Sequence, residues 1–317
     1  MNQNNNYTVP IYNCPPAFGG RYRFLFLGFL FPIFHYVIML MVQIVVTLFQ
    51  SFRLAFQMGA SVSEAELETK LLAFLTEYSD VLSIVSAVLT VLLAFLVYLL
   101  ISSRIKNRQL TPPSVKTYFS LHKIRLGLVG KLVLLAFFFY HFVLGFLNLV
   151  GFLAPNLMES YNDAAQSVDT GTSVFSLVMS FFALVIAAPI TEELIYRNMA
   201  IANMRSRMPA VGAVFVSSIV FGFFHGNLVW MLYAGGLGLL FGFLYVKSES
   251  IYVSLVVHTV FNLIGFVYSV LGNFANESMV SVINVVSFCL ILISLVGAPL
   301  VFLWVWFGLS KKDKPIQ

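Results

Sequence analysis

Long apolar runs dominate this sequence and leave few folds open to it. About eight stretches of roughly 20 residues are long enough to cross a bilayer as α-helices. Of the 317 residues, 60% are hydrophobic and only 10% are charged, whereas a soluble domain carries about 25% charged residues. The stretches lie at about Phe24–Gln50, Val81–Ser103, Leu126–Leu153, Val174–Met204, Ala210–His225, Leu228–Val246, Ile251–Leu271 and Val282–Leu309. We therefore predict an all-α, polytopic transmembrane bundle of about eight helices.

The positions of the lysines and arginines predict how this bundle is oriented. With both termini inside, the outer segments contain only Arg53 and Lys70. The inner segments contain Arg21, Arg23, Arg104, Lys106, Arg108, Lys116, Lys123, Arg125, Arg205, Arg207, Lys247, Lys311, Lys312 and Lys314. Because basic residues are retained on the cytoplasmic side, we predict a multi-pass protein of the cell membrane with N-in, C-in topology.

The net charge of +5 does not indicate a nucleic-acid partner, because the basic residues are scattered over loops. Membrane topology explains them better, and the lipid bilayer is the expected surrounding. Cys14 and Cys289 are poorly placed to pair, so neither a disulfide framework nor a cysteine metal site is expected. The first apolar run is too long for a cleavable signal peptide.

The chain divides into four predicted parts. Residues 1–23 form a polar tail expected to be disordered. Residues 24–172 contain the first membrane helices and an amphipathic outer helix in "SEAELETKLLAFLTEY", which opens with a capping box from Ser63 to Glu66. Residues 173–272 hold the polar groups discussed next, and residues 273–317 hold the last helix and a basic tail.

The stretch "APITEELIYR" places two adjacent glutamates at membrane depth, where ionisable groups are costly and tend to be functional. Pro189 removes a backbone donor just before them, which predicts a kink. Glu193 and Arg197 are spaced i,i+4 with the acid first, the order that favours an ion pair. We assign Glu193 and Arg197 to a structural clamp and Glu192 to a cavity, although helical geometry alone also allows the reverse.

Two further polar pairs lie in later spans. "FGFFH" places His225 one turn after Phe221, and "HTVFN" places His258 and Asn262 on one face of a helix. A glutamate and an imidazole can activate buried water, while a second imidazole and an amide can hold an oxyanion. Two histidines and a glutamate are also a zinc ligand set, so zinc is possible, although the preferred interpretation requires no cofactor and uses Asn262 better.

The other polar and glycine features have simpler interpretations. His35 and His141 stand in apolar helices without acids one turn away, which favours packing or hydrogen-bonding roles. His122 lies in a basic inner loop. Glycines thin the helix at Gly222 and Gly226 and form a GxxxG pattern further on, which is typical of close helix packing.

The ordered motifs resemble the CPBP family of intramembrane proteases, which includes type II CaaX prenyl endopeptidases and bacteriocin-processing or immunity (Abi-like) proteins. The family pattern EExxxR, FxxxH and HxxxN stands here in order, over about residues 173–272. The resemblance implies a catalytic set of Glu192, Glu193, Arg197, His225, His258 and Asn262. It also implies that Glu192 and His225 activate water while His258 and Asn262 stabilise the transition state. The family has been described as metal-dependent as well.

The function predicted from the sequence is therefore an intramembrane endopeptidase acting on peptides or proteins in or at the membrane. The resemblance allows prenylated CaaX proteins, leader peptides or bacteriocins as substrates, and the sequence does not distinguish among them. A non-catalytic immunity or sensor-partner protein that keeps the fold is the alternative. A proton-coupled carrier and a heme-binding bundle are further alternatives, and the absence of internal repeats disfavours the carrier. The sequence leaves the oligomeric state open.

Overall fold

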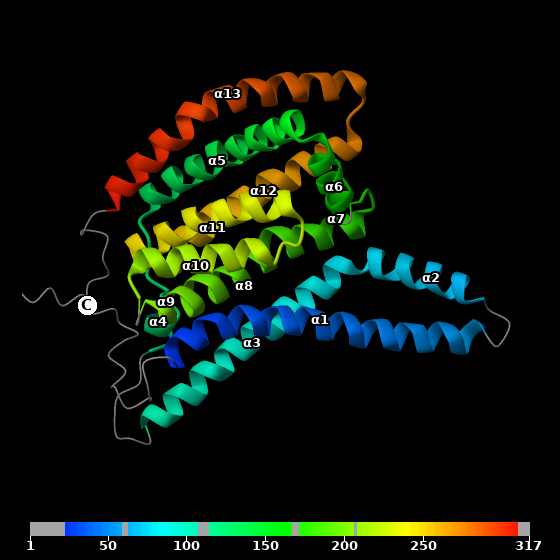
Figure 1. The fold of residues 1–317 in the computed structure, drawn as a ribbon, viewed down its shortest axis with the longest axis horizontal. Helices are drawn as coiled ribbons and strands as arrows, with labels where there is room; N and C mark the ends of the chain where they lie inside the picture. Colours follow the sequence, from blue (N-terminus) through cyan, green and yellow to red (C-terminus); the bar gives the residue numbers. More distant parts are fainter. Residues whose placement is uncertain (1–22, 59–62, 107–113, 167–170, 206–207, 310–317) are drawn as a thin grey trace, which may run out of the picture.

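The computed structural model describes residues 23–58, 63–106, 114–166, 171–205 and 208–309. This part of the chain is helical and contains no strand, which confirms the predicted all-α bundle (Figure 1). Seven of its helices are long and apolar enough to cross a membrane, so the protein is an integral membrane protein. The predicted N-terminal tail lies outside the described residues except for Arg23, and so does the basic C-terminal tail.

The helices follow one another with short connections. Their bounds are α1 Arg23–Met58, α2 Glu64–Glu77, α3 Ser79–Lys106, α4 Val115–Tyr118, α5 Leu126–Leu153, α6 Pro155–Gln166, α7 Val174–Ser180, η3 Phe181–Ala187, α8 Ala188–Glu192, η4 Glu193–Ile201, α9 Ala202–Met204, α10 Ala210–Phe223, α11 Leu228–Ser248, α12 Ile251–Phe274 and α13 Glu277–Gly308. The start of α1, the end of α3, the start of α5 and the end of α13 lie at one end of the bundle (Figure 1). The predicted topology requires this grouping. Which end faces the cytoplasm stays a prediction.

Helices α1, α2 and α3 form an arm that extends past the rest of the bundle (Figure 1). The predicted cap of α2 is present, because the Ser63 hydroxyl accepts a hydrogen bond from the Glu66 amide at 3.3 Å. The Glu66 side chain pairs with Lys70 at 3.0 Å. The halves of α1 and α3 next to α2 expose large apolar side chains such as Phe56, which is 83% exposed. Such surfaces are expected where helices face lipid.

The main body packs α5 between α12 and α13 and places α11 beside α12 (Figure 1). Its core is a cluster of buried apolar side chains from these four helices. They are Leu132, Leu135, Ala136, Leu237, Leu240, Phe241, Leu244, Val253, Val257, Phe261, Val305 and Leu309. This core fixes α12 against α5 and α11, and α12 carries His258 and Asn262.

Helices α10 and α11 approach closely along a seam of small residues. A Cβ added at Gly222 would lie 2.5 Å from the Met231 carbonyl oxygen, and one at Gly238 would lie 3.1 Å from Ser218 Cα. These glycines therefore permit backbone contact, as expected for helix packing. Gly226 differs from its predicted packing role. It has φ of 77° and open space around it, so it serves the turn after α10.

The fifth predicted span is shorter than expected. Helix α10 ends at Phe223 and has 14 residues, which is about 21 Å of helix and less than a bilayer core requires. Its apolar composition suggested a full span, but the chain turns at residues 224–227 and re-enters as α11. This turn places His225 inside the bundle.

The fourth span departs from α-helical geometry on both sides of Pro189. It contains two π-helical segments, η3 and η4, which flank the α-helical turn of α8. The Ala188 amide donates to the Ala183 carbonyl five residues earlier, and Pro189 has no amide hydrogen. The Leu184 carbonyl is thereby left without either of its helical donors. π-Helical turns of this kind occur often at functional sites.

Candidate active site

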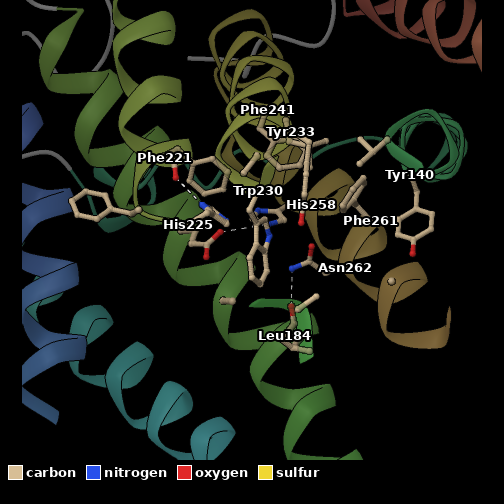
Figure 2. A pocket seen from close by; sticks show the side chains of 18 of the residues that line it. Tyr140, Leu184, Phe221, His225, Trp230, Tyr233, Phe241, His258, Phe261 and Asn262 are labelled. Carbon is tan, nitrogen blue, oxygen red and sulfur yellow. Dashed lines mark hydrogen bonds and ion pairs between the residues drawn. The ribbon is translucent and has the colours of Figure 1, made fainter. Parts of the chain in front are cut away.

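A cavity of about 630 Å³ lies within the bundle. Four of the six predicted site residues line it, namely Glu192 from α8, His225 from the turn after α10, and His258 and Asn262 from α12. Figure 2 shows His225, His258 and Asn262 around one space. Glu193 and Arg197 do not line the cavity and lie behind His258. The polar motifs, far apart in the sequence, therefore meet in one place.

His258 lies between the two adjacent glutamates. Its Nδ1 is 2.9 Å from Glu193 Oε1, and its Nε2 is 3.5 Å from Glu192 Oε2. Adjacent helical residues diverge, as predicted, but the two carboxylates reach opposite nitrogens of one ring. An imidazole that carries both protons can donate to both carboxylates. The ion-pair contact of Glu192 is thus with His258, and its expected cooperation with His225 stays a prediction.

Glu193 and Arg197 form the predicted clamp. Arg197 Nε lies 3.4 Å from Glu193 Oε2, and the two side chains are 1% and 0% exposed. The guanidinium also lies over the rings of Phe221 and Phe241, at 4.6 Å and 5.2 Å from their centroids. In the described part of the chain, its two terminal nitrogens have no hydrogen-bond partner. The negative charge of Glu193 and the faces of these two aromatic rings therefore stabilise the buried guanidinium.

The imidazole of His258 is further fixed by Phe241. The two rings stack with centroids 4.7 Å apart and planes inclined by 25°. Because Phe241 is buried and also lies under Arg197, it connects the clamp to the ring that faces the cavity. The three helices η4, α11 and α12 thus hold His258 in one orientation.

His225 is oriented by its own helix end. Its Nδ1 lies 2.8 Å from the Phe221 carbonyl oxygen, which can only accept, so Nδ1 carries the hydrogen. In the neutral ring Nε2 is then an acceptor. The rings of Phe221 and Trp230 lie against His225, with centroids at 4.8 Å and 6.2 Å. The FxxxH spacing therefore supplies both the ring contact and the carbonyl that sets the tautomer.

Asn262 has a structural contact that the motif does not reveal. Its Nδ2 donates to the Leu184 carbonyl at 2.8 Å (Figure 2). This is the carbonyl left without a helical donor by η3 and Pro189. Asn262 therefore ties α12 to the fourth span, and its second amide hydrogen and its oxygen are the groups that remain for a ligand.

The sequence did not reveal that His35 and several aromatic side chains, here called the aromatic wall, line the cavity. His35 on α1 lines the cavity, as do Tyr140, Trp230 and Tyr233 from α5 and α11. A lone histidine and scattered aromatics in apolar helices have no spacing that distinguishes them from packing residues. For His141 the expected hydrogen-bonding role is confirmed, because its two ring nitrogens contact the Phe137 carbonyl and the Tyr268 hydroxyl at 2.8 and 3.0 Å.

A zinc site would make a specific demand on the side chains around the cavity. Zinc needs three protein ligands converging on one point. In the described ranges, no group of three His, Cys, Asp or Glu side chains is arranged to hold a metal ion. Whether the protein uses a metal stays a prediction.

Comparison with known proteins agrees with the motifs. Residues 174–264 match the family model described as "Type II CAAX prenyl endopeptidase Rce1-like". A segment of 77 residues is 31% identical to the "Putative membrane peptidase YdiL" of Bacillus subtilis strain 168, covering 24% of this chain and 32% of that protein. The matched segment thus spans about a third of that relative. No solved structure matches the chain. These matches confirm the resemblance inferred from the ordered motifs: residues 174–264 of this chain are similar to the Rce1-like endopeptidases of the CPBP family.

Proposed function

We propose that this protein is an intramembrane endopeptidase of the cell membrane that hydrolyses peptide bonds in its central cavity. The observation that carries the proposal is the arrangement around His258, where one carboxylate is neutralised behind the ring and the other faces the cavity. Glu193 is fully buried beside Arg197, whereas the Glu192 side chain is 22% exposed. Glu192 is thus the carboxylate that can reach water.

In this proposal Glu192 is the general base. It takes a proton from water as the water oxygen attacks the substrate carbonyl carbon. The proton then passes to the amide nitrogen as the carbon–nitrogen bond breaks, leaving a carboxylate and an amine. His258 faces Glu192 across 3.5 Å and orients its carboxylate, and Glu193 with Arg197 holds His258 in place.

The remaining polar groups face the substrate. His225 presents Nε2 to the cavity because Nδ1 is bound to the Phe221 carbonyl. The free amide hydrogen of Asn262 is available to the oxygen that becomes negative as water adds. The aromatic wall of Tyr140, Trp230 and Tyr233 lines the same cavity, and its low polarity strengthens each of these interactions.

The test uses the purified protein in lipid nanodiscs with a panel of quenched fluorescent peptides. Glu192→Gln keeps the size of the side chain and removes the base, so turnover should fall about 10²- to 10⁴-fold. His225→Ala should also lower turnover. Glu68→Gln changes an exposed glutamate on α2 and serves as the matched control.

Equal turnover by wild type and Glu192→Gln would overturn the proposal and favour a non-catalytic partner role. A chelator added to the active protein tests metal dependence separately. Survival of the activity in the chelator would indicate that no exchangeable metal is needed. Because the peptide panel contains both prenylated and plain peptides, it also selects among the substrate classes.

A further inference from the structure

His35 is the one described histidine that lines the cavity from outside the residues matched by the family model. It lies on α1, which packs against η4 and α3. The ring of the neighbouring Tyr36 lies against that of Phe224, with centroids 4.9 Å apart, so this part of α1 contacts the turn that carries His225. A residue from the N-terminal arm thereby reaches the cavity wall.

The hydrogen bonds of His35 define which ring nitrogen carries the hydrogen. Its Nδ1 lies 3.1 Å from the hydroxyl oxygen of Thr90 on α3. Thr90 donates its only hydroxyl hydrogen to the Ser86 carbonyl at 2.8 Å. The Thr90 oxygen can therefore only accept from His35, so Nδ1 is protonated and Nε2 of the neutral ring is an acceptor.

Thr90, which anchors the His35 ring, is shielded from water. Thr90 is 1% exposed and Ser86 is 4% exposed, so the chain from His35 to the Ser86 carbonyl is shielded from competing water. His225 and His258 show the same pattern, with Nδ1 bound to the Phe221 carbonyl and to Glu193. Three imidazoles around one cavity are thus each anchored through Nδ1.

Among the described residues, the hydrogen bond at Nδ1 is the only one that His35 makes, so its Nε2 is open to a donor. Glu192 lines the same cavity, but an ionised carboxylate only accepts hydrogen bonds. The donor that a peptidase brings into such a cavity is the backbone N–H of its substrate. Because His35 lines the cavity, a substrate that supplies this N–H gains a hydrogen bond that a substrate without it lacks.

We propose that His35 is a substrate-binding residue whose Nε2 accepts a hydrogen bond from a backbone N–H of the peptide, and that Thr90 positions it. This inference rests on the proposed function. It adds a contact from α1 to a site whose motif residues all come from the fourth and later spans. Helix α1 lies outside the residues matched by the family model.

The experiment measures peptide affinity in the inactive Glu192→Gln protein, using the peptide that wild type cleaves best. Adding His35→Ala should weaken binding about three- to tenfold, the equivalent of one lost hydrogen bond. His35→Gln, whose amide oxygen can accept, should recover part of the loss. Thr90→Val removes the anchor without changing side-chain size and should weaken binding in the same direction by a smaller factor.

Peptides carrying an N-methyl group at successive positions identify the donor. At one position methylation should weaken binding to Glu192→Gln but have no further effect once His35 is alanine. His141→Gln, which alters a buried histidine away from the cavity, is the matched control and should leave affinity unchanged. A merely structural role for His35 would not produce this dependence on one peptide N–H.

The outcomes separate the two proposals. If wild type cleaves peptides and His35→Ala binds them as tightly as its parent, the role of His35 is wrong and the proposed function stands. If every methylated peptide loses affinity equally in both proteins, His35 does not contact a backbone N–H. If wild type neither cleaves nor binds any peptide, the proposed function is wrong and this inference fails with it.

Discussion

Two clusters of polar side chains, each centred on a histidine, include residues of helix α12. One satisfies its buried polar groups with ion pairs and the other with neutral hydrogen bonds. In the first cluster, His258 contacts Glu193 and Glu192 at 2.9 and 3.5 Å, and Arg197 follows behind. In the second, His141 of α5 bonds to the Phe137 carbonyl and to Tyr268, which in turn accepts from Ser287 of α13 at 3.1 Å. The first cluster is charged and the second is neutral.

The difference shows which polar cluster has capacity for chemistry. In the neutral cluster each donor has an acceptor: Ser287 donates to Tyr268, Tyr268 to His141, and His141 to Phe137. His141 is 0% exposed and does not line the cavity. In the charged cluster, Glu192 has one side on the cavity and is only partly satisfied by His258. A closed cluster holds helices together, whereas an open one can bind water or substrate.

The largest stability effect is expected from breaking the charged cluster at its buried end. Glu193→Gln leaves the Arg197 cation without its counter-charge and should destabilise the protein by about 3–5 kcal/mol. Adding Arg197→Met removes the unpaired charge and should restore part of that loss. Thermal unfolding in detergent measures both variants, and additive losses in the double variant would show that the two side chains do not act as a pair.

Asn262 joins the charged cluster to the backbone of the fourth span. Asn262→Leu leaves the Leu184 carbonyl unpaired and should cost about 1–3 kcal/mol. Pro189→Ala restores an amide hydrogen close to that carbonyl, so the cost of Asn262→Leu should shrink in this background. The unfolding midpoints of the four proteins form a double-mutant cycle. An unchanged cost would mean that the missing amide of Pro189 is not what Asn262 replaces.

The seam between α10 and α11 sets where His225 lies relative to His258. Gly222→Ala places a methyl group against the Met231 carbonyl, where an added Cβ would lie at 2.5 Å. The two helices must separate, at about 1–3 kcal/mol, and the turn carrying His225 should shift, lowering turnover as well. Gly236→Ala, where an added Cβ meets nothing within 4 Å, is the matched control. Equal stability and turnover in both variants would contradict this account of the seam.

The smallest effect is expected from opening the neutral cluster. His141→Leu keeps the side-chain volume and removes two hydrogen bonds, while Tyr268 keeps its contact with Ser287. We expect a loss of about 0.5–1.5 kcal/mol in the free energy of unfolding. Turnover of the proposed substrate, measured beside stability, should not change. A large fall in turnover without a fall in stability would instead give the His141 cluster a part in the reaction.

Much of the fold follows from local patterns in the sequence. The apolar runs fix the helices because each is long enough to span and contains few charges, and seven described helices meet this condition. The i,i+4 spacing of Glu193 and Arg197 predicted their ion pair, and the Ser63 to Glu66 spacing predicted the cap of α2. These features depend on residues one turn apart, and helical geometry alone places such residues together.

The sequence by itself determined the membrane-spanning helical class and the polar motifs of the core. Only the tertiary structure decided that His258 lies between both glutamates, that Asn262 donates a hydrogen bond to the Leu184 carbonyl, and that His35 lines the cavity. Each of these contacts joins helices separated by dozens of residues, so no local period records it. Their positions follow from how α1, α5, α11 and α12 pack around the fourth span, because packing fixes which faces of those helices meet.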